Sequence, residues 1–146
     1  PTLYYGDEAG VCGWTDPDNR RTYPWGNEDR EMIAFHKEMI RIHRDYEIFK
    51  TGSLYYLHNE YRLIGYGRFL REEAAFVMLQ IGGEDREVEV DVWQLGLQDG
   101  EMMASMIETN RDGFSVKADL KRVKDGKVTV KVRADGAVIW KCIKVK

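Results

Sequence analysis

The sequence predicts a mainly β protein: an antiparallel β-sandwich over residues 52–146, preceded over residues 1–51 by one strand, one loop and one helix. Three observations predict this organisation. Asp-Gly pairs recur through the second part of the chain, two segments alternate apolar and charged residues, and one earlier segment has apolar residues at helical spacing. Turn signals at regular intervals between alternating segments are typical of sandwiches.

The composition is that of a globular protein. The 146 residues are 43% hydrophobic and 32% charged, which supports a packed core and argues against disorder. The net charge of −3 gives no overall attraction to nucleic acids or anionic membranes, and the apolar runs are too short to span a bilayer. We therefore expect neither a nucleic-acid partner nor a membrane partner.

The first elements are a strand, a loop and a helix. Thr2–Tyr5 has strand character and Gly6 ends it, after which the loop is rich in Asp, Arg, Trp and Pro. Asn27 is predicted to cap a helix over residues 28–46, with acidic residues in its first turn. One apolar stripe contains Met32, Phe35, Met39 and Ile42, and a second contains Ile33, His36, Ile40 and His43. So broad a face predicts two packing partners, and we expect a homodimer through this helix.

Short strands follow from Gly52. The predicted strands are Leu63–Leu70, Ala74–Ile81, Arg86–Val92, Phe114–Leu120, Lys127–Arg133 and Ala137–Val145. The predicted turns are the Asp-Gly pairs at 99–100, 112–113, 125–126 and 135–136, together with Gly82-Gly83. Asp-Gly supplies the positive φ angles of tight hairpin turns.

Two of these strands place valines on one face and charges on the other. Residues 87–92 alternate valine with acidic residues, and residues 127–133 alternate valine with mostly basic residues. Each strand should bury one face and expose the other. The opposite signs predict a solvated surface with complementary charges, in which each pair contributes about 0.2–1 kcal/mol.

Three motifs in the first 26 residues carry a family resemblance. They are PTLYYGDE at 1–8, DPDNRR at 16–21 and YPWG at 23–26. In this order they resemble the last barrel strand and following loop of α-amylase-family glycoside hydrolases, especially the neopullulanase, cyclomaltodextrinase and amylopullulanase group. YGRF at 66–69 resembles the opening of that family's C-terminal β domain. The resemblance implies a chain that begins within a larger fold, with a truncated (β/α)8 barrel over 1–51 and the C-terminal sandwich over 52–146.

The resemblance also implies substrate-binding residues. Asp16 and Arg20 would contact glucose hydroxyls, since a carboxylate accepts hydrogen bonds and a guanidinium donates them in a fixed fork. The alternative is a local turn at Asp16 with an ion pair to Arg20. Trp14, with Tyr23 and Trp25 on the same loop, would stack on sugar rings or pack the loop onto the barrel rim.

No catalytic residue is predicted within the chain. By the resemblance, the catalytic carboxylates belong to earlier barrel strands, upstream of Pro1. Asp7 and Glu8 are adjacent and are expected to organise the loop through hydrogen bonds to the backbone. The parent would be a retaining hydrolase of α-glucosidic bonds in maltooligosaccharides, pullulan or cyclodextrins, with α-1,4 and α-1,6 preference both open. The chain alone should be inactive.

Metal and cofactor sites are not expected. A calcium loop at Asp16 would need a small acidic or amide residue where Arg20 stands and a glycine where Arg21 stands. His36 and His43 are interpreted as packing residues, because no third ligand lies near them in the sequence.

Cys12 and Cys142 are interpreted as two unpaired thiols, which leaves the compartment open between cytoplasmic and secreted.

A second function class is a non-catalytic carbohydrate-binding or interaction module. Such a sandwich should present a row of exposed aromatic residues on one sheet. The charged strand faces instead favour a scaffold that supports the barrel, and Trp93 and Trp140 are predicted to lie in the sandwich core.

Overall fold

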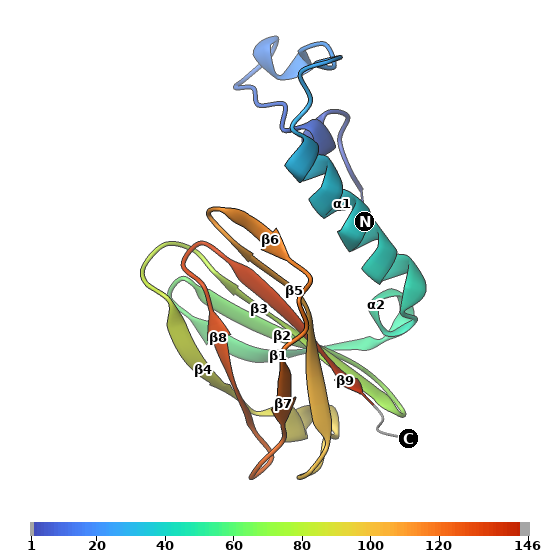
Figure 1. Ribbon diagram of the computed structural model, residues 1–146, viewed down its shortest axis with the longest axis vertical. Coiled ribbons are helices and arrows are strands. Elements are labelled where there is room, and N and C mark those ends of the chain that lie inside the picture. Colours follow the sequence, from blue (N-terminus) through green and yellow to red (C-terminus); the bar gives the residue numbers. More distant parts are fainter. Residues whose placement is uncertain (1, 144–146) are drawn as a thin grey trace. The chain divides into compact units, whose positions relative to one another are not determined.

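The computed structural model describes residues 2–143, which form two compact units that divide after Asp45. The first unit contains the 3-10 helices η1 (Asp7–Ala9) and η2 (Asp18–Arg20) and the α-helix α1 (Arg30–Asp45). The second unit begins with the short helix α2 (Ile48–Thr51) and is otherwise β-rich (Figure 1). Its strands are β1 (Ser53–Glu60), β2 (Leu63–Leu70), β3 (Glu73–Gln80), β4 (Arg86–Val90), β5 (Met102–Asn110), β6 (Gly113–Ser115), β7 (Leu120–Arg122), β8 (Val128–Val132) and β9 (Ala137–Ile143), with the 3-10 helix η3 (Val92–Leu95) between β4 and β5.

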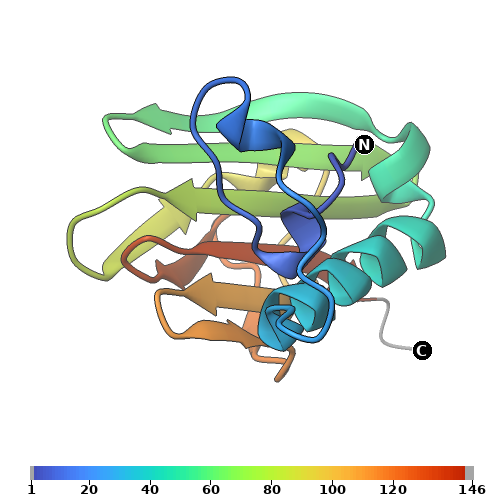
Figure 2. The ribbon, with the colours of Figure 1, turned by 90° about the horizontal axis from the view of Figure 1, so that it is seen from above.

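The strands form two antiparallel sheets. The larger has the order β1-β2-β3-β9-β5-β6, with β7 also paired to β5, and the smaller pairs β4 with β8 (Figures 1 and 2). One core contains buried residues from both sheets, including Phe76, Val88, Val130 and Trp140. The predicted antiparallel sandwich is therefore confirmed.

An aromatic pair occupies the centre of that core. Phe76 and Trp140 are nearly fully buried, and their rings stack with centroids 6.5 Å apart at 14°. Gly67 on β2 faces the same core, and a Cβ there would collide with the Leu95 side chain. The absence of a side chain at Gly67 is what lets η3 approach the sheet so closely.

The structure corrects the placement of Trp93. Its side chain is 58% exposed on η3, whereas Trp140 lies in the core as predicted. The expected strand 86–92 ends at Val90, and the chain then turns into η3, so that Trp93 no longer follows the strand alternation.

Most predicted strands are observed within one or two residues, and β2 has the predicted bounds. The prediction of one strand over Phe114–Leu120 is wrong. This segment is divided into β6 and β7, which pair with different stretches of β5. Between them Ser105 anchors the crossing chain: its N–H donates to the Asp119 carbonyl and its hydroxyl accepts from the Asp119 N–H, at 2.9 and 2.8 Å.

One predicted hairpin is observed in full. Asp125 and Gly126 have φ angles of 51° and 72° and close a two-residue turn between Lys124 and Lys127, whose backbones pair. Positive φ at both central positions is the geometry for which Asp-Gly is favoured.

The charged faces of β4 and β8 also pair as predicted. Val88 lies opposite Val130 and faces the core, while Glu87 lies opposite Lys131 on the outer face. At the two ends of this sheet, Lys127 Nζ lies 2.6 Å from Glu89 and Lys131 Nζ lies 2.8 Å from Asp85. The outer face of this sheet is therefore solvated and carries acidic side chains on β4 next to basic side chains on β8.

The strand predicted at Thr2–Tyr5 is not observed. Residues 2–4 have no regular secondary structure, and the Tyr4 backbone bonds locally to Asp7: its N–H donates to Asp7 Oδ2 and its carbonyl accepts from the Asp7 N–H, both at 3.1 Å. A strand needs a neighbouring strand to satisfy its backbone, and within residues 2–143 none pairs with this segment.

The helix start is also corrected. α1 begins at Arg30 and is capped by Asp29, not Asn27: Asp29 Oδ1 accepts from the Met32 N–H at 2.9 Å. Asn27 instead closes a turn by donating its backbone N–H to the Pro24 carbonyl. Both residues suit a cap, and the turn at Pro24 decides which of them reaches the helix.

Candidate functional site

The candidate site is the loop between η1 and α1 in the first unit. Its middle is η2, which begins after a cis peptide bond between Asp16 and Pro17. The Asp18 N–H donates to the Thr15 carbonyl and the Arg20 N–H to the Pro17 carbonyl, at 2.9 and 3.0 Å. These bonds place the predicted residues on one tight turn.

Asp16 and Arg20 contact each other directly. Arg20 Nε donates to Asp16 Oδ1 at 3.3 Å and Nη2 donates to Oδ2 at 3.2 Å, a two-pronged arrangement. The local ion pair that the sequence left as an alternative is thus present. Both side chains remain largely exposed, at 69% for Arg20 and 62% for Asp16, so the pair presents donors and acceptors to solvent.

A second pair, not anticipated from the sequence, supports the first. Asp18 accepts from Arg21 at 2.6 Å through Oδ1 and from the Trp14 N–H at 3.0 Å through Oδ2. These hydrogen bonds, the Arg21 bond first, lower the pKa of Asp18, so it is ionised at neutral pH. Asp18 therefore ties the two ends of the turn together, and the i, i+3 spacing of Asp18 and Arg21 was the signal in the sequence.

Gly13 explains how the loop closes on itself. A Cβ at this position would lie 2.7 Å from both the Asn19 Cα and the Asp18 carbonyl oxygen. Only glycine allows the two backbone stretches to approach this closely.

The aromatic residues of the loop divide into two settings. The Trp14 side chain is 83% exposed, next to the Asp16 turn. Tyr23 and Trp25 form a tilted pair with centroids 4.6 Å apart, and partial desolvation, with the charges of Glu8 and Glu28, raises the pKa of Tyr23. Trp25 is 82% exposed despite this contact, so both tryptophans offer aromatic surface on the loop, and Trp14 is the one two residues before Asp16.

Asp7 and Glu8 have the loop-organising role predicted for them. Asp7 Oδ2 accepts from the Tyr4 N–H and Glu8 Oε2 from the Gly6 N–H, each at 3.1 Å. By accepting these backbone hydrogen bonds, the two carboxylates stabilise the turn that contains η1.

Several predicted residues lie away from this loop. His36 binds within its own helix, with Nδ1 2.9 Å from the Met32 carbonyl oxygen. Cys12 is exposed and Cys142 is buried, and no disulfide joins them. Within the described part of the chain, no group of three His, Cys, Asp or Glu side chains could hold a metal ion, and no helix is long and apolar enough to cross a membrane.

The chain has clear relatives among known proteins, although no protein-family model matches it. It is 33% identical over 95% of its length to an amylopullulanase of Thermoanaerobacter thermohydrosulfuricus, covering 10% of that protein. It is 32% identical over 66% of its length to neopullulanase 2 of Thermoactinomyces vulgaris, covering 17% of that protein. The chain therefore spans about a tenth to a sixth of these two relatives.

Solved structures show the same fold. An Anoxybacillus α-amylase matches 98% of this chain with a TM-score of 0.80 at 22% identity, using 29% of its own length. The Nostoc punctiforme debranching enzyme matches 96% with a TM-score of 0.72 at 26% identity, using 27% of its length. The chain is thus a homologue of amylopullulanases, neopullulanases and cyclomaltodextrinases, and its fold matches the C-terminal domain of α-amylase-family glycoside hydrolases.

Proposed function

We propose that the chain is the C-terminal part of a glycoside hydrolase that acts on α-glucosidic bonds of starch-derived glucans. The observation that carries this proposal is the exposed Asp16–Arg20 fork beside Trp14, on the loop whose motifs resemble the family's substrate-side loop. The relatives' names refer to pullulan and cyclomaltodextrins, which are α-glucans.

In this proposal the loop positions the substrate. Asp16 accepts hydrogen bonds from glucose hydroxyls, Arg20 donates to sugar oxygens, and the Trp14 ring stacks on the apolar face of a glucose unit. Asp18 and Arg21 keep the turn in place. No step of bond cleavage is assigned to these residues.

Catalysis would use carboxylates elsewhere in the parent enzyme. A retaining glycosidase needs a nucleophile and an acid/base about 5–5.5 Å apart. Asp7 and Glu8 are engaged with backbone amides, which argues against their serving as this pair. Residues 1–51 would complete the catalytic barrel and residues 52–146 would form the supporting sandwich.

The alternative, a non-catalytic module, receives less support from the small sheet, whereas β1 of the larger sheet exposes Tyr55 and Tyr56. The outer face of β4 and β8 carries charged side chains that form ion pairs such as Lys127–Glu89. A flat aromatic platform is absent from the described strands of this small sheet.

Hydrolysis assays on two proteins test the proposal. The full-length enzyme should release reducing sugar from maltotriose, pullulan or cyclodextrin, and the 146-residue chain alone should release none from any of them. Steady release by the chain alone would refute the assignment of catalysis to the rest of the parent. A full-length protein that is inactive on all three substrates would refute the glucan assignment.

A further inference from the structure

Trp93 is an exposed indole that the backbone around it holds in place. The Trp93 N–H donates to the Gly126 carbonyl at 2.8 Å, and the Trp93 carbonyl accepts from the Gly96 N–H at 2.9 Å. The side chain is nevertheless 58% exposed. The indole is therefore exposed to solvent, although hydrogen bonds hold both the backbone N–H and the backbone carbonyl of Trp93.

The turn at Asp125-Gly126, just before β8, supports one side of this indole. A Cβ at Gly126 would lie 3.0 Å from Trp93 Cβ and 3.2 Å from Trp93 Cδ1. Gly126 lacks a Cβ, and its φ of 72° also favours glycine, so the tryptophan rests directly against the backbone of the turn. The Trp93 indole contacts the turn on one side and is open to solvent on the other, so an aromatic surface is already in place for a ligand.

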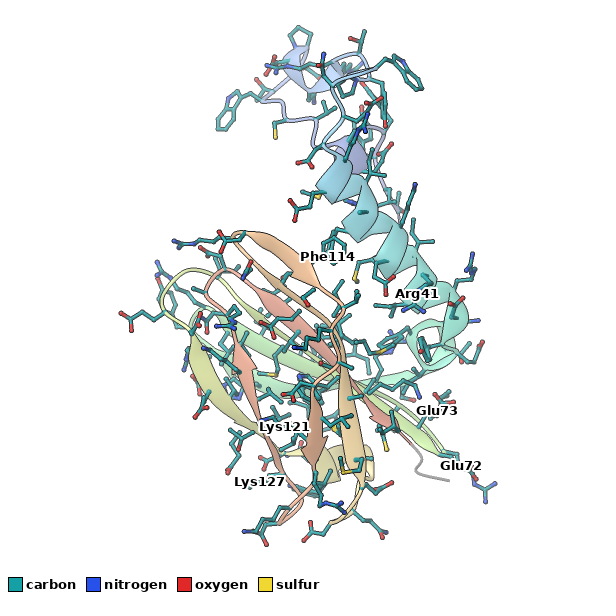
Figure 3. The ribbon with its side chains drawn as sticks, viewed as in Figure 1. Arg41, Glu72, Glu73, Phe114, Lys121 and Lys127 are labelled. Atoms are coloured by element: carbon teal, nitrogen blue, oxygen red, sulfur yellow. The ribbon has the colours of Figure 1, made fainter. Side chains whose placement is uncertain are left out.

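Two carboxylates lie on or next to the turn that supports this surface. Asp99 Oδ1 accepts from the Gly126 N–H at 2.7 Å, a bond that does not use the second carboxylate oxygen. Asp125 is exposed on the same turn. Lys127, directly before β8 (Figure 3), is committed to Glu89 at 2.6 Å and lies 3.8 Å from Asp91. The setting therefore favours a neutral ligand rich in hydroxyl donors over an anionic one.

We propose that Trp93 and Asp99 form a second carbohydrate-binding site, on the sandwich, for a chain of α-linked glucose units. The indole stacks on the apolar face of one glucose unit, and the Asp99 carboxylate accepts hydrogen bonds from its hydroxyls. The choice of α-glucan rests on the proposed function above. This site belongs to the second unit and shares no residue with the Asp16–Arg20 loop.

Titration of the 146-residue chain with maltoheptaose tests the site. The indole Nε1–H signals of the four tryptophans report separately by NMR, and the Trp93 signal should shift with saturation. Titration calorimetry, which does not need the Trp93 signal, should show binding by Trp93→Ala weakened about tenfold or more, the loss expected when a stacked anchor worth roughly 1.4 kcal/mol is removed. Trp93→Phe should retain part of it, and Asp99→Asn should weaken it without moving the other indole signals.

Tyr61→Ala is the matched control, because it removes an exposed aromatic residue from the turn between β1 and β2 of the same unit and should leave the Trp93 shift unchanged. No shift at Trp93, equal binding by Trp93→Ala, or equal binding of cellohexaose would each overturn the proposal. Hydrolysis by the full-length enzyme is measured separately. If that enzyme cleaves maltotriose while the Trp93 signal stays silent, the second site alone is refuted.

Discussion

At the scale of single residues, the same ion-pair chemistry serves two purposes. Asp18 and Asp85 each accept both a side-chain and a backbone donor, and these bonds hold a loop in shape. The Asp16–Arg20 pair has no backbone partner in the described structure and is more than 60% exposed at both side chains. Because the Asp16–Arg20 pair makes no bond to the described backbone around it, either side chain can bind a ligand in place of the other without disturbing the loop.

Replacing Arg20 in the parent enzyme should therefore affect substrate binding more than stability. We expect Arg20→Ala to raise KM about tenfold with little change in kcat, since a positioning group contributes to ground-state binding. Steady-state kinetics on maltotriose and a thermal melt check this. Arg21→Ala is the control, and should loosen the loop through Asp18. A lower melting temperature with unchanged KM for Arg20→Ala would assign the pair a structural role only.

Asp85 should make the sandwich sensitive to acid. Hydrogen bonds from Lys131, then from the Ala134 N–H and Arg133, lower the pKa of Asp85 well below its usual range. A carboxyl whose pKa is lower in the folded state stabilises fully above its unfolded pKa of about 3.9, and this contribution is lost as the pH falls further. Thermal melts between pH 2 and pH 7 should show a shallower acid decline for Asp85→Asn than for wild type. Parallel curves would contradict this expectation.

At the scale of elements, hydrogen bonds at the ends determine where each helix and strand begins. Asp29 caps α1 through its side-chain oxygen, which accepts from the Met32 N–H, while Asn27 lies in the turn that its backbone N–H closes with Pro24. Segment 114–120 is split because Ser105 holds the chain between β6 and β7. The local sequence allows either helix cap and either an undivided or a divided strand, and the hydrogen bonds to other residues determine which one forms.

The cap assignment can be measured on matched variants. Asp29→Ala should reduce the stability of the helical unit by about 0.5–2 kcal/mol, because the Met32 amide loses its acceptor. Asn27→Ala removes no cap and should have almost no effect. Helical circular dichroism during thermal unfolding distinguishes the two, and a larger loss for Asn27→Ala would restore the cap expected from the sequence.

At the scale of the whole molecule, α1 presents more apolar surface than a solvated helix normally leaves open. Met32 is 37% exposed and Ile40 is 51% exposed, while Ile33, Phe35 and Met39 are half-buried. An amphipathic helix with uncovered apolar side chains tends to find a partner.

We therefore expect the isolated chain to self-associate through this helix, with Ile33, His36 or Ile40 at the interface. Light scattering at rising concentration should show a dimer or larger assembly. Ile40→Glu should shift it toward the monomer, whereas Ala34→Glu, at another exposed position of α1 outside both stripes, should not. A monomer at high concentration in the unmodified chain would refute the interface.

The sequence by itself determined the features that depend on local periodicity and turn chemistry. The alternation in 87–92 and 127–133 predicted both the buried valines and the complementary charges, and Asp125-Gly126 predicted the tight turn before the second of these strands. The sequence offered the Asp16–Arg20 ion pair as one of two alternatives, because a local turn at Asp16 brings the two side chains together.

Only the tertiary structure decided the features that depend on a distant partner. The strand β5 was missed because its Met, Ala and Glu residues have weak strand propensity, and it forms through pairing with β9, β6 and β7. Trp93 is exposed because the chain leaves β4 at Val90 and turns into η3, where the Trp93 N–H donates to Gly126, 33 positions later. Thr2–Tyr5 has the composition of a strand but does not form one, because no strand within residues 2–143 pairs with it. Pairing across the sequence is a long-range property, and local pattern constrains it only weakly.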